Sequence, residues 1–520
     1  AFRRDPEGRL DRAACFEQFR SLALESLSAF WRYEFSRFVA REDIDRSAYT
    51  AVAGRILAGA PFMRSLIRAN GEVSLEPFAL EELMADRLVG MLLRDTVVAA
   101  SAFERLFTSV RERLLHDASA RARAPLRFLC DLAMQCFNNE LAFAESAQES
   151  IAVQALGESL EQGVASGADV RRDLATYAMY RPLSTFASSL SSLEQDPGFA
   201  DLLRRTVIEP AEERRLRDSL PRADIRHAVS RQVQSMYEEN PYPRWLALSE
   251  RPVRKASEWL ASAVVGRHAS LEMPDAPEIL VAGCGTGQDA LYLAREIEGA
   301  RITAIDLSAT SLAYAKRMAL RYGATNIEFM QADLAELQGP ARYDMVFSVG
   351  VLHHLADPLR GLRALVGVCR PGGLLKLGLY SARARTAIAA ARALVREQGW
   401  PATPAGIRAF RQYVLGLEAS SPLRGLLDYR DFYVLSECRD LVFHVQEHDF
   451  TLPELEKLIA DAGLKTLAFA LPLPQASLEA YRERFPEDAG MSDFAHWEKI
   501  ENQLQDTFAQ MYRVFCVAPS

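Results

Sequence analysis

A glycine-rich segment is the part of the sequence whose residue types and spacing most clearly predict chemistry. Residues 279–288 read ILVAGCGTGQ, so an apolar run leads into Gly283, Gly285 and Gly287, and an amphipathic run follows over 289–296. Glycine lets the backbone come close to a ligand where a Cβ atom would clash. A helix that begins here leaves N–H groups free beside the ligand. The spacing is G-x-G-x-G rather than the G-x-G-x-x-G of dinucleotide-binding proteins. We predict a cofactor-binding turn; the alternatives are a similar sheet that binds NAD or nothing.

Two acidic residues end further apolar runs, where they would meet the same ligand. Asp306 follows the run RITAI at 301–305, and it lies about 20 residues beyond the glycines, where an acidic residue accepts hydrogen bonds from both hydroxyls of a ribose. Asp333 and Leu334 end a third run, where an adenine ring would lie. Because ligands bind at the carboxyl ends of the strands in sheets of this kind, we expect these side chains and the glycines to form one site.

A pair of histidines follows the fourth apolar run, residues 343–349. These are His353 and His354. Histidine is the side chain whose ordinary pKa suits proton transfer near neutral pH. One of the two, His353 in preference, could contact the substrate or act as a general base. The alternative is that they only begin the next helical turn.

A second histidine pattern lies at residues 444–448, which read H-V-Q-E-H. This is the spacing of a zinc pattern in which both histidines share one helix face. The surrounding residues LVFHVQEHDF alternate as in a strand, and no third ligand is evident, so we expect no metal. We instead expect Glu447 and His448 to belong to a polar segment that reaches the site, with a solvated strand end as the alternative.

Two kinds of pattern divide the chain. Residues 1–220 show the spacing of amphipathic helices, as in the apolar stripe from Phe103 to Leu114. After a charged, proline-bounded stretch at 210–221, short aliphatic runs alternate with helical stretches. This alternation is typical of a parallel sheet covered by helices. We predict an all-α domain over residues 1–220 and an α/β domain over residues 221–520.

The α/β pattern is interrupted by more helix at residues 381–440, which contain nine arginines and no lysine. These arginines could bind an anionic substrate or form solvated helix faces. A capping box at 451–454 predicts a helix that ends at Gly463. Strands are expected over 464–471 and 511–518.

Residues 278–380 resemble the S-adenosylmethionine-binding core of class I methyltransferases. The series GCGTG, IDLS, QADL, FSVGVLHHL and RPGG occurs in the order and at the spacing of that family. The run at 511–518 is similar to its antiparallel seventh strand. One departure is Val281-Ala282, where the family often has an acidic residue that helps to anchor the methionine end of the cofactor.

The resemblance implies a fold, a cofactor and a set of binding residues. The fold is a Rossmann-like α/β domain of seven strands with a helical insertion after strand five, next to the all-α domain. The cofactor is S-adenosylmethionine. The implied cofactor-binding residues are Gly283, Gly285, Gly287, Asp306, Leu307, Asp333, Leu334 and Val349.

The whole chain is further similar to bacterial methyltransferases with helical, sometimes tetratricopeptide-containing, N-terminal extensions. The residues that carry this likeness are 135–140 (QCFNNE), 236–245 (MYEENPYPRW) and 443–448 (FHVQEH). Aromatic residues of the second segment could close over the cofactor, because an aromatic face suits a sulfonium cation. The alternative is a proline-rich linker packed on the sheet. The candidate substrate or lid residues are Tyr237, Tyr242, Trp245, His354, Glu447 and His448.

Composition excludes several classes of partner. The chain has 61 Lys+Arg and 69 Asp+Glu, a formal net charge of −8, so we do not expect nucleic acid as a partner. No apolar run approaches the length of a membrane span, and residues 1–10 lack the apolar region of a signal peptide. The seven cysteines are scattered without a C-x-x-C pair, which favours reduced thiols and a cytoplasmic location. Assembly into a homo-oligomer stays open.

Three functions remain. We expect a methyltransferase whose acceptor is a protein or peptide side chain, because a large helical domain offers a docking surface. The alternatives are a small-metabolite methyltransferase and a methyltransferase fold that has become a binding module.

Overall fold

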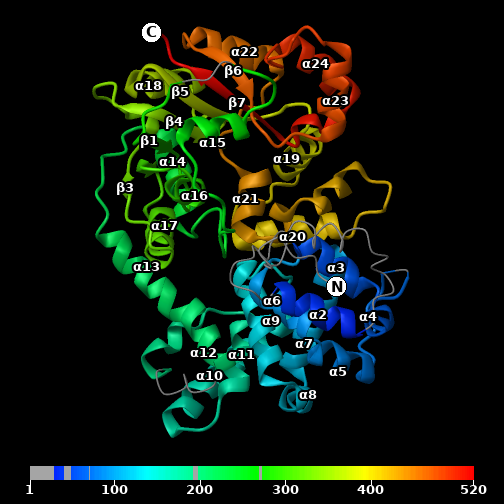
Figure 1. The fold of residues 1–520 in the computed structure, drawn as a ribbon. Helices are drawn as coiled ribbons and strands as arrows, with labels where there is room; N and C mark the ends of the chain where they lie inside the picture. The colour runs from blue at the N-terminus through cyan, green and yellow to red at the C-terminus, as the bar shows by residue number, and fades with distance from the viewer. Residues whose placement is uncertain (1–28, 40–48, 70, 191–196, 269–271) are drawn as a thin grey trace. The chain divides into compact units, whose positions relative to one another are not determined.

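The computed structural model describes residues 29–39, 49–69, 71–190, 197–268 and 272–520 (Figure 1). The chain divides into two compact units. Unit 1 comprises residues 1–211, 246–250 and 399–441, and unit 2 comprises residues 212–245, 251–398 and 442–520. Residues 1–10, in which we expected no signal peptide, lie outside the described residues. No helix in the described ranges has both the length and the apolar character to cross a membrane.

Unit 1 is built from helices. Its helices before residue 211 are α2 (Ala29–Val39), α3 (Thr50–Ala58), α4 (Pro61–Leu66), α5 (Pro77–Ala85), α6 (Arg87–Asp95), α7 (Ser101–His116), α8 (Ala118–Arg123), α9 (Leu126–Asn138), α10 (Ala147–Ser166), α11 (Arg171–Ala178), η3 (Leu183–Ser189), α12 (Pro197–Leu203) and η5 (Arg204–Ile208). Those after residue 399 are α20 (Pro404–Leu415), η8 (Pro422–Asp428), η9 (Arg430–Tyr433) and α21 (Leu435–Phe443), which ends in unit 2. Helix α13 (Glu209–Asp218) occupies the stretch that we expected to link two domains.

Apolar stripes and caps explain these helices. Phe103, Phe107, Val110 and Leu114 are all buried on α7, as the stripe predicted. The apolar residues from Leu80 to Leu92 belong to two helices, α5 and α6. Asp86 separates them, because its carboxylate accepts hydrogen bonds from the first N–H groups of α6.

A buried polar network holds residues 399–441 within unit 1. Arg411 is fully buried, and its guanidinium donates to Oε2 of Glu104 at 2.6 Å, to the carbonyl of Phe432 at 2.6 Å and to the carbonyl of Ala142. Arg408 donates twice to the carbonyl of Leu141, at 2.9 and 2.7 Å. Apart from the contact with Phe432, these contacts join residues 267 to 307 positions apart, so no local sequence pattern predicts them.

The QCFNNE segment supplies a second part of this network. The carboxylate of Glu140 accepts hydrogen bonds from the N–H and the hydroxyl of Ser436, at 2.7 and 2.9 Å, and so caps the start of α21. Glu140 and Leu141 have φ angles of 58° and 59°, which non-glycine residues adopt rarely. This left-handed bend lies next to the carbonyls of Leu141 and Ala142, which accept hydrogen bonds from Arg408 and Arg411. We infer that the bend presents those carbonyls to residues 399–441.

Unit 2 contains a seven-stranded sheet in the order β3-β2-β1-β4-β5-β7-β6. The strands are β1 (Glu278–Ala282), β2 (Arg301–Asp306), β3 (Ile327–Gln331), β4 (Tyr343–Val349), β5 (Cys369–Tyr380), β6 (Lys465–Phe469) and β7 (Met511–Val517). Strand β7 runs antiparallel to both of its neighbours. The accompanying helices are α14 (Ala228–Glu238), α15 (Ala256–Ala263), α16 (Gln288–Glu296), α17 (Ala309–Arg321), η6 (Leu334–Glu336), η7 (Leu352–His354), α18 (Pro358–Val368), α19 (Thr386–Gln398), α22 (Leu452–Asp461), α23 (Gln475–Arg484), α24 (Phe494–Gln503) and η10 (Gln505–Phe508). The predicted Rossmann-like sheet of seven strands is confirmed.

The prediction for residues 441–450 is wrong in one respect. We expected a strand, whereas α21 continues to Phe443 and residues 444–448 have no regular secondary structure. The apparent alternation misleads because Leu441, Val442 and Phe443 are all buried in succession, and Val445 is 52% exposed. The helix predicted next is confirmed, since Thr451 and Glu454 form both hydrogen bonds of a capping box at the start of α22.

Candidate functional site

The carboxyl ends of the parallel strands bring the predicted residues to one edge of the sheet. Ala282, at the end of β1, pairs with Ile305 of β2, and Asp306 pairs with Gln331 at the end of β3. Parallel strands end at the same edge, so the loops that follow β1, β2 and β3 start side by side. Leu307 and Val349 lie at the ends of β2 and β4 at this edge and are partly exposed.

The glycine turn, residues 283–287, requires glycine for two reasons. Gly283, Gly285 and Gly287 have φ angles of +76°, +51° and +76°, which side chains with a Cβ rarely adopt. A Cβ at Gly285 would also lie 2.7 Å from the carbonyl oxygen of Tyr242. From the sequence we expected the glycines to let the backbone approach a ligand. At Gly285 the group that comes close is instead the backbone of Tyr242.

Asp306 links the glycine turn to the loop after β2. Its Oδ2 accepts the N–H of Gly285 at 2.7 Å, and its Oδ1 accepts the N–H of Ser308 at 2.8 Å. Burial raises the pKa of Asp306 to about 6, although both of these N–H groups act to lower it. Glu238, which caps α17 by accepting the N–H of Ala309 at 2.7 Å, raises the pKa further.

Asp333 provides a buried acceptor that lacks a donor. Its side chain is 3% exposed, and Oδ1 accepts the N–H of Ala335 at 2.9 Å. Oδ2 has no hydrogen-bond partner within the part of the chain that the structure describes. A buried carboxylate oxygen without a partner is costly, so this position fits a ligand that brings an N–H or O–H donor. The amino group of an adenine ring is such a donor, and the neighbouring Leu334 is buried and apolar.

The aromatic segment 236–245, which begins at the end of α14, contacts the glycine turn. The indole N–H of Trp245 donates to the carbonyl of Thr286 at 3.1 Å, and the hydroxyl of Thr286 donates to the carbonyl of Pro243. The rings of Tyr237 and Tyr242 stack, with centroids 5.1 Å apart. These contacts agree both with a segment that covers the ligand and with a linker packed on the sheet, so they do not distinguish the two interpretations.

His353 and His354 form η7 beyond the end of β4. His353 is fully buried, and its ring stacks on that of Tyr380 with centroids 3.7 Å apart. Neither ring nitrogen of His353 has a hydrogen-bond partner among the described residues. Burial, followed by the nearby His354 and Arg385, lowers the pKa of His353 well below its ordinary value. This lowered pKa favours the neutral form of the His353 imidazole.

Residues 444–448, which we call the covering segment, lie across this pair of histidines. The ring of His444 stacks on that of His354 at 3.8 Å, and the N–H of His448 donates to the carbonyl of His353 at 2.8 Å. Glu447 forms ion pairs with Arg385 and Arg392. The structure thus brings the two histidine patterns of the sequence together.

Sequence reasoning missed three participants of this cluster. Tyr380 is the last residue of β5, and Arg385 and Arg392 lie in the arginine-rich stretch that follows it. From the sequence, those arginines could either bind an anionic substrate or form solvated helix faces. The side chain of Arg385 is 1% exposed, so the second interpretation does not hold for it.

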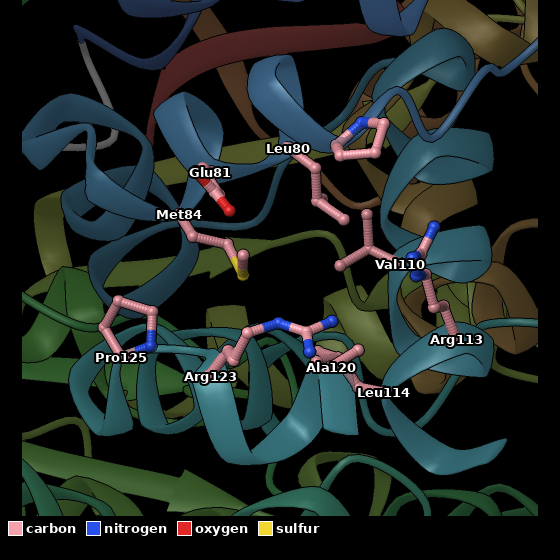
Figure 2. Close-up of a pocket in the computed structure, with 10 residues that line it drawn as sticks. Leu80, Glu81, Met84, Val110, Arg113, Leu114, Ala120, Arg123 and Pro125 are labelled. Atoms are coloured by element: carbon pink, nitrogen blue, oxygen red, sulfur yellow. The ribbon is translucent and has the colours of Figure 1, made fainter. Parts of the chain in front are cut away.

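A separate pocket lies in unit 1 (Figure 2). Figure 2 shows Leu80, Met84 and Val110 pointing into the space between α5, α7 and α8. Its lining is mostly apolar and includes the charged residues Glu81, Arg113 and Arg123. None of the candidate site residues from the sequence lines this pocket.

Comparison with known proteins assigns part of unit 2 to a domain family. Residues 279–373 match the model of a methyltransferase domain family. The chain carries a class I S-adenosylmethionine-dependent methyltransferase domain. The matched residues of this methyltransferase domain begin in β1 and end within β5, so they contain the glycine turn, Asp306, Asp333 and both histidines of η7.

Three curated relatives illustrate the range of similar proteins. An uncharacterized protein of Synechococcus sp. is 34% identical over 254 residues, 47% of this chain and 60% of that protein. The ubiquinone biosynthesis O-methyltransferase of Leptothrix cholodnii is 35% identical over 101 residues, 19% of this chain and 42% of that enzyme. The trans-aconitate 2-methyltransferase of Deinococcus radiodurans is 33% identical over 117 residues, 22% of this chain and 43% of that enzyme. The chain thus spans between two fifths and three fifths of the length of these relatives.

Proposed function

We propose that the chain binds S-adenosylmethionine at the edge of the sheet and transfers its methyl group to a small-molecule acceptor. The observation that supports cofactor binding is the Oδ2 atom of Asp333, which has no partner among the described residues. It is buried at the same edge of the sheet as the glycine turn and Asp306. Asp306 would accept the ribose hydroxyls, and Asp333 and Leu334 would hold the adenine. The remaining contacts would come from Gly283, Gly285, Gly287, Leu307 and Val349.

The chain's own residues supply alignment and a dry environment. When bound, S-adenosylmethionine supplies a methyl group that is already activated by its sulfonium. The protein therefore gains most from holding the acceptor in line and excluding water. The covering segment and the stacked rings of His353 and Tyr380 would shield the acceptor from water beyond the ends of β4 and β5. If the acceptor loses a proton, His353 would be the candidate to accept it, because neither of its ring nitrogens has a partner among the described residues.

The enclosure favours a small acceptor. His353 is fully buried and His354 is 7% exposed beneath the covering segment. A local movement of this five-residue segment would open a space that suits a small acceptor better than a side chain carried by a folded protein. Two of the relatives are named for ubiquinone biosynthesis and for trans-aconitate, both of them small molecules. A protein or peptide acceptor, our expectation from the helical region, is the alternative. Mass spectrometry of a cell lysate incubated with the enzyme and methyl-labelled cofactor distinguishes the two by the mass of the labelled product.

Removal of the Asp306 carboxylate tests the cofactor site. We expect Asp306→Ala to weaken S-adenosylmethionine binding at least tenfold, because each charge-assisted hydrogen bond contributes roughly 1.5–3 kcal/mol. Titration calorimetry measures the change. Asp357→Ala is the matched control, since it removes a carboxylate that caps α18. An unchanged affinity in Asp306→Ala would remove Asp306 from the site.

The pKa of Asp306 predicts a pH dependence of the same binding. With the pKa raised to about 6, the carboxyl is protonated below that pH and loses one acceptor for the ribose hydroxyls. Affinity for S-adenosylmethionine should therefore be constant above about pH 7 and fall by up to about tenfold per pH unit below 6. Asp306→Asn, which cannot ionise, should bind weakly at every pH without this decline. Calorimetry across this range would contradict the prediction if both proteins followed the same curve.

A further inference from the structure

Two arginines, one of them fully buried, converge on a single buried carboxylate of the covering segment. Nη2 of Arg385 donates to Oε1 of Glu447 at 3.0 Å, and Nη1 of Arg392 donates to the same oxygen. The side chains of Arg385, Arg392 and Glu447 are 1%, 15% and 1% exposed. We call Arg385 and Arg392 the arginine pair. Guanidinium groups in this arrangement are a well-suited receptor for a carboxylate.

The arginine pair and its carboxylate come from elements of different rigidity. Arg392 lies within α19 and Arg385 directly precedes it, whereas Glu447 lies in a segment without regular secondary structure. Nε of Arg385 also lies 3.3 Å from Oδ1 of Asp449, so two cations face two carboxylates. Loss of Glu447 would leave a buried positive charge, which is costly until another anion replaces it.

The arginine pair lies one ring away from the histidine that lacks partners. The guanidinium carbon of Arg385 is 3.6 Å from the ring centroid of Tyr380, and the ring of His353 is 3.7 Å from the same centroid. Two groups this close to one ring must occupy its opposite faces. Tyr380 therefore separates the arginine pair from His353, whose two nitrogens have no hydrogen-bond partner in the described ranges.

We propose that the arginine pair is the carboxylate subsite for the methyl acceptor, and that Glu447 occupies this subsite when no acceptor is bound. The acceptor class is then a small carboxylic acid, anchored through its carboxylate and methylated at another atom. Its carboxylate displaces Glu447, the covering segment moves away from His353 and His354, and a polar group of the acceptor gives His353 its missing hydrogen bond. This inference rests on the proposed function.

Binding of glutarate, a simple dicarboxylate, to the full-length chain tests the subsite. Glu447→Gln keeps the shape of the side chain and removes its charge, so glutarate should bind this variant at least tenfold more tightly than the wild type. Arg392→Gln combined with Glu447→Gln should lose the gain. Glu456→Gln removes the charge of an exposed glutamate on α22 and should show no gain. Glutaramide, the neutral diamide, should bind none of these proteins, and inorganic phosphate should bind less tightly than glutarate.

Two readouts separate this inference from the proposed function. Calorimetry with S-adenosylmethionine alone tests the cofactor site, and Glu447→Gln should bind the cofactor as the wild type does. If the cofactor binds and Glu447→Gln gains no affinity for glutarate, Glu447 is a structural anchor and the inference is overturned. Preferential binding of phosphate would overturn the carboxylate class. Should Glu447→Gln fail to fold, Glu447→Asp loosens the same ion pairs, and a gain of at least threefold for glutarate is then expected.

Discussion

Gly285→Val should abolish the binding of S-adenosylmethionine. The φ of Gly285 is +51°, which a β-branched residue hardly adopts, and its Cβ would lie 2.7 Å from the carbonyl oxygen of Tyr242. The turn must shift, and the hydrogen bond from the N–H of Gly285 to Asp306 is lost with it. We expect affinity to fall at least about 100-fold, equivalent to about 2.8 kcal/mol.

A second glycine with a left-handed backbone provides the control for this variant. Gly323 has a φ of +66°, and an added Cβ would meet nothing within 4 Å among the described residues. Gly323→Val therefore introduces comparable backbone strain outside the turn, and we expect it to bind the cofactor normally. Calorimetry on both folded variants decides the matter. Binding by Gly285→Val within threefold of the wild type would show that the glycine turn is not part of the site.

Arg411→Met should strongly lower the free energy of unfolding of unit 1. Arg411 is fully buried and donates to Glu104, whose side chain is 2% exposed, at 2.6 Å. Burial already raises the pKa of Glu104, and Arg411 opposes this rise. Removal of one partner of such a pair leaves a buried charge uncompensated and costs about 3–5 kcal/mol. Urea unfolding followed by circular dichroism should show an earlier transition.

A double-mutant cycle separates the ion pair from the packing of the arginine stem. If the loss of stability comes from the unpaired Glu104 carboxylate, the double variant Glu104→Gln, Arg411→Met should lose less free energy of unfolding than the two single variants lose together. Arg424→Met, in the same part of unit 1, removes a guanidinium that donates to the carbonyl of Leu417 and should cost little. Additive losses in the cycle would show that the pair is not coupled.

The sequence was most informative where chemistry is local. Three strand-ending motifs, at the glycine turn, Asp306 and Asp333, depend on residues that lie within a few positions of one another, and the structure brings all three to one edge of the sheet. The seventh strand and the capping box of α22 could be predicted for the same reason.

Long-range polar contacts account for what could not be predicted. Glu104 and Arg411 are 307 positions apart, and Glu140 and Ser436 are 296 positions apart. No periodicity relates such residues, so residues 399–441 could not be assigned to the N-terminal helices from their pattern. Glu447 could be named as a candidate from its histidine-flanked motif, but its partners Arg385 and Arg392 could not, because a charged residue in an arginine-rich stretch resembles any solvated position until its burial is known.

The discontinuity of unit 1 has a consequence for its synthesis on the ribosome. At about 5–20 residues per second, the interval between the emergence of Glu104 and that of Arg411, 307 positions later, is roughly 15–60 s. During this interval the N-terminal helices lack the cation that neutralises a carboxylate in their core, while the strands of the sheet are still being added. We expect the nascent helices to remain sensitive to protease until residues 399–441 have left the exit tunnel. Release of arrested chains before and after this point would show a stepwise gain in resistance.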